Sequence, residues 1–317
     1  MLSRVADSLY WMSRYLERAE HTARVLGVTL NQTLDQTAGP TQQRWDRLFA
    51  CLRAETPSAS DSYTLVRSVT FDMANGASIA ASVTAARENA RQIREQISSE
   101  MWEQLNRLYL HVRGTTMDEI WRGEPQEFLR EVKDGAHLFQ GITDSTLSHD
   151  MGWQFIQLGR YIERAEAMAA LLDVYFGSLM SAERGQSNPL EFLEWVGLLK
   201  SCTAFEAYCK VYTASVQPER TFEFLLLNAD FPRSLRFSAD MIEVATRAIG
   251  RASGGRAGSR VDRLAGRLRA GLDYGQVDEI IADMHEYLAQ IRRQCAQIHS
   301  ALYQTYISYP ADVALVS

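Results

Sequence analysis

Apolar and small residues recur every three or four positions along the first thirty residues of the chain. They occupy Leu2, Val5, Leu9, Met12, Leu16, Ala19, Ala23, Leu26 and Leu30. This alternation is typical of a helix that packs along one seam in a helical bundle. A second run has the same spacing, and each of its members lies 146 positions after a member of the first: Phe155, Leu158, Ile162, Ala165, Ala169 and Leu172. The pattern predicts two equivalent packed helices.

A polar motif accompanies both runs. Residues 14–20 read RYLERAE and residues 160–166 read RYIERAE, so the two copies differ only at Leu16 and Ile162. Weaker similarity continues downstream, where residues 45–48 resemble 195–198 and residues 72–79 resemble 228–235. The chain is therefore interpreted as an internal duplication. We expect a first half at 1–147 and a second half at 148–317, packed as one continuous helical unit.

The pattern predicts an all-α fold, a helical bundle with long antiparallel helices, and no stretch alternates as a β-strand does. The stretch from Ala77 to Val112 lacks proline and glycine, although Ser98 and Ser99 can mark a bend. We expect breaks at Gly39-Pro40 and between Gly185 and Pro189, and a loop at 254–258. Helices are predicted at 2–36, 42–54, 61–73, 77–112, 125–146, 150–181, 189–215, 218–227, 232–250, 259–271 and 275–307.

The repeated motif is mostly polar, and this is informative. With the seam at heptad positions a and d, Glu17 and Arg18 fall at b and c, which face water in an isolated coiled coil. Both positions are nevertheless repeated as Glu163 and Arg164, and Trp11 and Tyr15 add bulk away from the seam. We infer that the helix is enclosed on more than one side and that the repeated charges are at least partly buried.

Buried charges need partners, and three interpretations remain open. Pairs within one helix can form a structural ion-pair network, as between Glu20 and Arg24 or between Arg160 and Glu163. Alternatively, the arginines can bind a carboxylate or phosphate in a pocket between the halves. In a catalytic version, Glu17 or Glu163 acts as a base. The candidate ligand-binding residues in the motifs are Arg14, Glu17, Arg18, Glu20, Arg160, Glu163, Arg164 and Glu166.

The two motifs, RYLERAEHTAR and RYIERAEAMAA, resemble the signature of the alpha-E family of bacterial all-helical proteins. The segment ARENARQIREQISSEMWEQLNRLYL at 86–110 resembles the second signature of that family. This resemblance adds Arg91, Arg94, Trp102 and Asn106 to the candidate ligand-binding residues. The helix at 277–306 lacks the second signature, so we expect an asymmetric site to which the first half contributes more polar groups.

The resemblance also implies partners. Alpha-E proteins are typically encoded beside, or fused to, a circularly permuted ATP-grasp protein and a transglutaminase-like protein. This context suggests a binding or accessory role in forming or removing amide bonds of peptides or proteins. An enzyme acting on an aminoacyl or amide substrate and a structural homo-oligomer are the alternatives.

Composition narrows the remaining possibilities for the 317 residues. The formal net charge of −6 argues against a whole-molecule nucleic-acid binder. The four cysteines form no CxxC motif, and no apolar run approaches a membrane span. We expect a cytoplasmic protein with reduced thiols. We predict no cofactor and no metal site, since Glu17 and His21 are four positions apart and His21 is replaced by Ala167 in the second copy.

Overall fold

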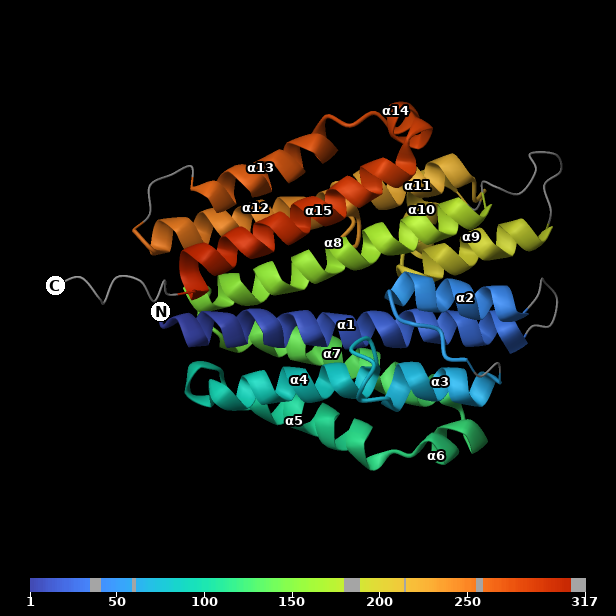
Figure 1. The fold of residues 1–317 in the computed structure, drawn as a ribbon, viewed down its shortest axis with the longest axis horizontal. Helices are drawn as coiled ribbons and strands as arrows, with labels where there is room; N and C mark the ends of the chain where they lie inside the picture. Colours follow the sequence, from blue (N-terminus) through green and yellow to red (C-terminus); the bar gives the residue numbers. More distant parts are fainter. Residues whose placement is uncertain (35–40, 59–60, 180–188, 214, 255–258, 309–317) are drawn as a thin grey trace.

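The computed structural model describes residues 1–34, 41–58, 61–179, 189–213, 215–254 and 259–308. Within these ranges the chain folds into fifteen α-helices and no strand, which confirms the predicted all-α class (Figure 1). The helices are α1 Ser3–Leu34, α2 Thr41–Leu52, α3 Ser62–Phe71, α4 Ile79–Gln92, α5 Ser99–Gly114, α6 Met117–Arg122, α7 Pro125–Thr146, α8 Met151–Leu179, α9 Pro189–Ser201, α10 Phe205–Tyr212, α11 Pro218–Leu227, α12 Leu235–Ala252, α13 Arg260–Asp273, α14 Val277–Ala282 and α15 Met284–Leu302.

Helices α1 and α8, which carry the two motifs, lie side by side at the centre of the molecule and run in the same direction (Figure 1). Their backbones approach closely at Gly159. A Cβ atom at that position would lie 2.3 Å from the carbonyl oxygen of Tyr10. Only glycine fits so close a backbone contact, so this residue brings the two motifs within reach of each other.

The packing around α1 repeats around α8. Helices α4 and α7 pack against α1, and α5 packs against both of them. Helices α12 and α15 pack against α8 in the same way, and α13 packs against both. Helices α2 and α9 each contact the central helix of the other half, α8 and α1 respectively. The predicted division near residues 147–150 falls in the short connection between α7 and α8.

Equivalent helix starts confirm that the weak similarity between 72–79 and 228–235 reflects equivalent structure. Ser78 caps α4 by accepting a hydrogen bond from the amide of Ala81, and its hydroxyl donates to the carbonyl oxygen of Asp72. Ser234 caps α12 and donates to the carbonyl oxygen of Asn228. Both serines therefore close the same kind of turn, one residue before the first turn of the helix.

Several predicted helices are divided in the structure. The helix predicted at 77–112 is a hairpin of α4 and α5, joined by a short 3₁₀ turn at 94–96 and restarted by the cap of Ser98. A continuous helix of this length would extend about 54 Å, whereas the hairpin packs α5 against α4 and α7. The helix predicted at 189–215 is interrupted at 202–204, the one at 275–307 breaks at Asp283, and α6 was not predicted.

Some expectations concern residues outside the described ranges. The predicted breaks at Gly39-Pro40 and from Gly185, and most of the loop at 254–258, belong to this group. Among the described helices, none is both long and apolar enough to cross a membrane.

Candidate functional site

The repeated charges lie in the contact between α1 and α8. Glu17 and Glu163 are each 2% exposed, and Arg164 is buried as well. The side chain of Arg18 retains 24% of its exposure. The inference that the motif is enclosed is therefore confirmed, and Arg18 is the most exposed of its charged side chains.

The arginine of each motif pairs with the glutamate of the other motif across the contact between α1 and α8. Arg164 of α8 donates from Nε and Nη2 to the two carboxylate oxygens of Glu17, at 2.6 and 3.0 Å. Arg18 of α1 donates from the same two nitrogens to Glu163, at 2.7 and 3.1 Å. Each copy of the motif thus supplies the glutamate that binds the arginine of the other copy. The predicted pairing of Arg160 with Glu163 within one helix is wrong because the close contact of α1 and α8 places better partners opposite.

Further ion pairs extend each reciprocal pair into a cluster. The Glu163 cluster consists of Arg14, Arg18, Arg53, Glu163 and Glu166. Within it, Arg14 donates to Glu163 at 2.7 Å and to Glu166 at 2.9 Å, and Arg53 lies 3.6 Å from Glu166.

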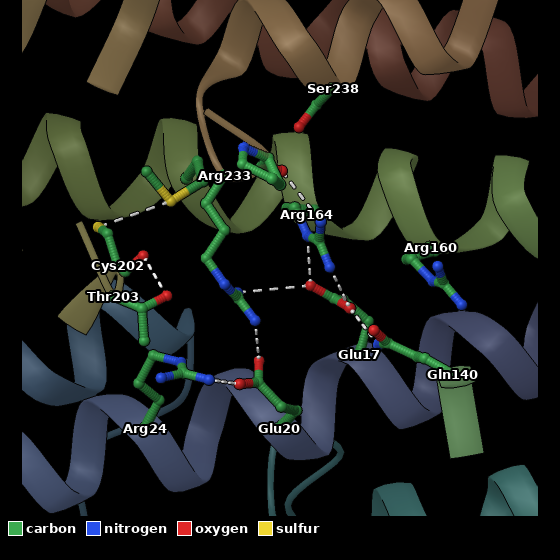
Figure 2. Close-up of polar contacts among 12 residues, drawn as sticks. Glu17, Glu20, Arg24, Gln140, Arg160, Arg164, Cys202, Thr203, Arg233 and Ser238 are labelled. Carbon is green, nitrogen blue, oxygen red and sulfur yellow. Dashed lines mark hydrogen bonds and ion pairs between the residues drawn. The ribbon is translucent and has the colours of Figure 1, made fainter. Parts of the chain in front are cut away.

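The Glu17 cluster consists of Glu17, Glu20, Arg24, Arg164 and Arg233 (Figure 2). Glu20 binds Arg233 at 2.7 Å and also binds Arg24, which is the one predicted intrahelical pair that forms. Arg233 lies 3.6 Å from Glu17.

The electrostatics of the clusters keep the central carboxylates ionised. Burial alone would raise the pKa of Glu17, but Arg164 and Arg233 outweigh it and hold the pKa well below its ordinary value. Burial acts in the same way on Glu163, and there Arg14 and Arg18 lower the pKa. A carboxylate so strongly stabilised as an anion is a poor acceptor of a substrate proton near neutral pH.

Arg160 does not repeat the role of Arg14, its counterpart. It is buried, and its Nη1 donates to the side-chain oxygen of Gln157 at 3.2 Å. Burial lowers the pKa of its guanidinium, and the nearby Arg164 lowers it further. The two copies of the motif therefore have unequal surroundings although their sequences are almost the same.

The largest difference between the clusters is one side chain in the equivalent turns. Arg233 precedes the cap Ser234 and reaches into the Glu17 cluster, whereas Ala77 occupies the corresponding place before Ser78. A cavity of about 790 Å³ adjoins the Glu163 cluster at this point. The residues that line it include Arg18, His21, Arg53, Asp72, Ala77 and Glu163.

His21 is a buried member of the cavity wall that pairs with no charge. Its Nε2 atom has no hydrogen-bond partner among the described residues. Burial, with a further contribution from Arg233, lowers its pKa to about 4, so the imidazole is neutral near pH 7. In the second copy the corresponding residue is Ala167. The cavity lining thus contains an uncharged polar group, His21, in addition to two arginines.

Sequence reasoning missed Arg53 and Arg233, and it set His21 aside. The signal for Arg233 lies in the comparison of 72–79 with 228–235, where arginine in one copy faces alanine in the other. Arg53 has no such signal in the motif, because it follows α2 and reaches the cluster only through the fold.

The candidates from the second signature lie elsewhere, on the α4–α5 hairpin. Arg94 lies over the ring of Trp102, and Asn106 accepts a hydrogen bond from Arg87 at 2.9 Å. Arg91 pairs with Glu88 at an exposed position. These four candidates neither join the two clusters nor line the cavity, so Arg18 is the predicted first-half candidate that the cavity wall contains.

The described residues contain no group of three or more His, Cys, Asp or Glu side chains placed to bind a metal ion.

Comparison with known proteins identifies a matching family model. Residues 1–307 match Alpha-E, described as a predicted alpha-helical domain with a conserved ER motif.

Three curated relatives, from Mycobacterium bovis and two strains of Mycobacterium tuberculosis, are uncharacterized proteins that share 25% identity with the chain over 345 residues. The alignment covers 98% of this chain but only 37% of each relative. No solved structure gives a significant match.

Proposed function

We propose that this chain, which belongs to the Alpha-E family, is a binding and accessory module for enzymes that form or remove amide bonds. The partners we propose are a circularly permuted ATP-grasp protein and a transglutaminase-like protein, in line with the resemblance noted from the sequence. The relatives extend well beyond the 37% of their length that this chain covers, which leaves room for such partners in the same polypeptide. The observation that carries the proposal is the open polar cavity beside the Glu163 cluster.

The geometry favours binding over catalysis by the motif residues. Arg164 engages both carboxylate oxygens of Glu17, and Arg14 and Arg18 together engage both oxygens of Glu163. A base must be free to approach the proton that it removes. Neither glutamate meets this requirement, so the enzymatic alternative has less support than a ligand-binding role.

The clusters also argue against an oligomer as the main role of the motif. The reciprocal pairs join α1 and α8 of a single chain, so the motif is satisfied without a second copy. Buried ion pairs of this kind specify a geometry more than they add stability. We therefore propose that they fix the relative position of the two central helices and the shape of the cavity.

Because the four cysteines are unpaired, we propose that the protein resides in a reducing compartment, the cytoplasm.

Co-expression of the chain with the ATP-grasp and transglutaminase-like proteins of the same organism tests the proposal. We expect a stoichiometric complex with the ATP-grasp protein on size-exclusion chromatography. We also expect the purified chain alone to turn over no aminoacyl or peptide substrate. A chain that binds neither protein, or that cleaves or transfers an amide without them, would contradict the proposed function.

A further inference from the structure

The two clusters have almost the same central geometry, so the second serves as an internal reference for the first. We propose that the cavity beside the Glu163 cluster binds a carboxylate group of a larger ligand, held by Arg18, Arg53 and His21. This inference rests on the proposed binding function and names the chemistry of its ligand. Three hydrogen-bonding groups on the cavity wall carry the argument.

Arg18 lacks an acceptor that its counterpart has. In the Glu17 cluster, Arg164 donates from Nε and Nη2 to the carboxylate of Glu17 (Figure 2). Its Nη1 donates to the carbonyl oxygen of Pro232 at 3.0 Å. Arg18 uses Nε and Nη2 on Glu163 in the same way. Its Nη1 makes no hydrogen bond to the described part of the chain, although the side chain lines the cavity. This nitrogen is therefore free to donate a hydrogen bond to a ligand in the cavity.

Arg53 is the second cation with unused donors. Its closest acidic partner is Glu166 at 3.6 Å, which is an ion pair without a hydrogen bond of normal length. The backbone at Arg53 has a φ of 54°, in the left-handed region, as does Thr203 at the corresponding turn with a φ of 50°. Glycine is the residue that adopts this backbone conformation at a helix end with the least strain. An arginine at this turn places a guanidinium on the cavity wall, where glycine would place nothing.

His21 supplies the third group. It lies on α1 one turn after Glu17, is 7% exposed, and its Nε2 atom is buried without a partner. Leaving a buried polar nitrogen unpaired is unfavourable, so a hydrogen-bond partner is expected there. A neutral imidazole that donates from Nε2 can meet a carboxylate oxygen without adding charge.

The charges around the cavity oppose a dianion more than a monoanion. Arg18 is already largely neutralised by Glu163, and Glu55 and Asp72 also line the cavity. These acids oppose a phosphate dianion more strongly than a carboxylate. Glu163 offers no free oxygen to a cationic ligand, because two guanidinium groups already bind it. The volume of about 790 Å³ exceeds what a free carboxylate needs and falls in the range of small-molecule sites. The carboxyl-terminal end of a peptide has the charge and the size that such a site requires.

Nuclear magnetic resonance of the full chain labelled with ¹⁵N-histidine tests the inference, because the His21 ring reports directly on the cavity. The probes are N-acetyl-dialanine with a free carboxylate, its C-terminal amide, and inorganic phosphate, all at constant ionic strength. We expect a saturable shift of the His21 ring signals with the free acid. The amide should bind at least about tenfold more weakly, since it lacks the charge that strengthens hydrogen bonds to arginine. Phosphate should bind more weakly than the acid.

Two kinds of variant sharpen the test. Ala77→Arg introduces the residue of the second copy and should weaken the shift by occupying part of the cavity, while Arg53→Gln should weaken binding and leave the cavity open. Arg91→Gln, at an exposed pair on the α4–α5 hairpin, is the matched control and should bind like the wild type. Thermal melting of each variant verifies the fold. If Ala77→Arg does not fold, Arg53→Gln decides.

Equal shifts from the acid and the amide, tighter binding of phosphate, or no saturable shift would overturn the carboxylate assignment. Unchanged binding by a folded Arg53→Gln variant would overturn it as well. The result is independent of complex formation. Acid binding by a chain that joins no partner would remove the proposed accessory role alone, and a stable complex without acid binding would remove the ligand assignment alone.

Discussion

The Glu17 and Glu163 clusters arise from one duplicated motif but differ in what completes them. In the Glu17 cluster the chain supplies its own Arg233, which binds Glu20 and fills the space beside the pair. In the Glu163 cluster Ala77 stands at the equivalent place, and a cavity with unused donors remains. The two copies of the motif therefore differ in their surroundings: Arg233 completes one cluster, and a cavity remains beside the other.

Removing the central glutamate should produce the largest effect. We expect Glu17→Gln to lower the free energy of unfolding by about 3 to 5 kcal/mol, because Arg164 and Arg233 lose a buried counter-ion. Glu163→Gln should cost less, since the partly exposed Arg18 gains solvation from the cavity. Urea unfolding of both variants measures the difference. A larger loss of unfolding free energy for Glu163→Gln would contradict the assignment of the Glu17 cluster as the one that the chain completes and the Glu163 cluster as the one beside the cavity.

Replacing Arg233 by alanine should make the Glu17 cluster resemble the Glu163 cluster, which has Ala77 at the equivalent place. We expect Arg233→Ala to cost about 2 to 3 kcal/mol, less than loss of the glutamate because Glu20 still binds Arg24. The reverse change, Ala77→Arg, enters an existing cavity and should alter stability by less than about 1 kcal/mol. Both values come from urea unfolding. If Arg233→Ala is as stable as the wild type, Arg233 is not the residue that completes the Glu17 cluster.

The third difference between the two copies is His21 in place of Ala167, and its effect on stability depends on pH. Burial lowers the pKa of His21 to about 4, whereas a histidine in the unfolded chain titrates near 6.5. The unfolded state therefore binds the proton first. The stability due to this residue is complete above pH 6.5 and is lost as the pH falls toward the folded value.

Between pH 6.5 and 5 we expect the wild type to lose about 2 kcal/mol more than His21→Ala, which carries the residue of the second copy. The free energy of unfolding of both proteins at the two pH values gives the difference directly. Parallel losses in the two proteins would mean that His21 is not buried as a neutral imidazole.

The smallest effect is expected on the α4–α5 hairpin. Arg91 and its partner Glu88 are both exposed, and water screens such pairs strongly. Arg91→Gln should change neither the melting temperature nor the binding of the acid probe measurably. A clear loss of binding would return the second signature to the site and would require a different cavity.

The sequence allowed prediction of the fold class and of the burial of the motif, because both depend on periodic positions along single helices. The apolar seam and the repeated Glu and Arg positions were sufficient for this. Chain reversals were harder to predict. The turn before Ser98 interrupts a stretch with neither proline nor glycine, so only the need to bury both α4 and α5 explains it.

The partners of the motif charges depend on contacts between helices and could not be read from spacing within one helix. Arg164 meets Glu17 because Gly159 permits the close approach of α1 and α8. Arg53 reaches Glu166 only through the turn after α2. The exception is Arg233, which a position-by-position comparison of the two halves could have identified from its replacement by Ala77.

A double-mutant cycle on Glu17 and Arg164 tests the central claim, that the two copies of the motif bind each other inside the protein. The free energies of unfolding of Glu17→Gln, Arg164→Met and the double variant are measured in urea. We expect the double variant to be more stable than the sum of the single losses predicts, by about 1 to 3 kcal/mol, because each single change leaves a buried charge unpaired. Additive losses would contradict the reciprocal pairing of the two helices.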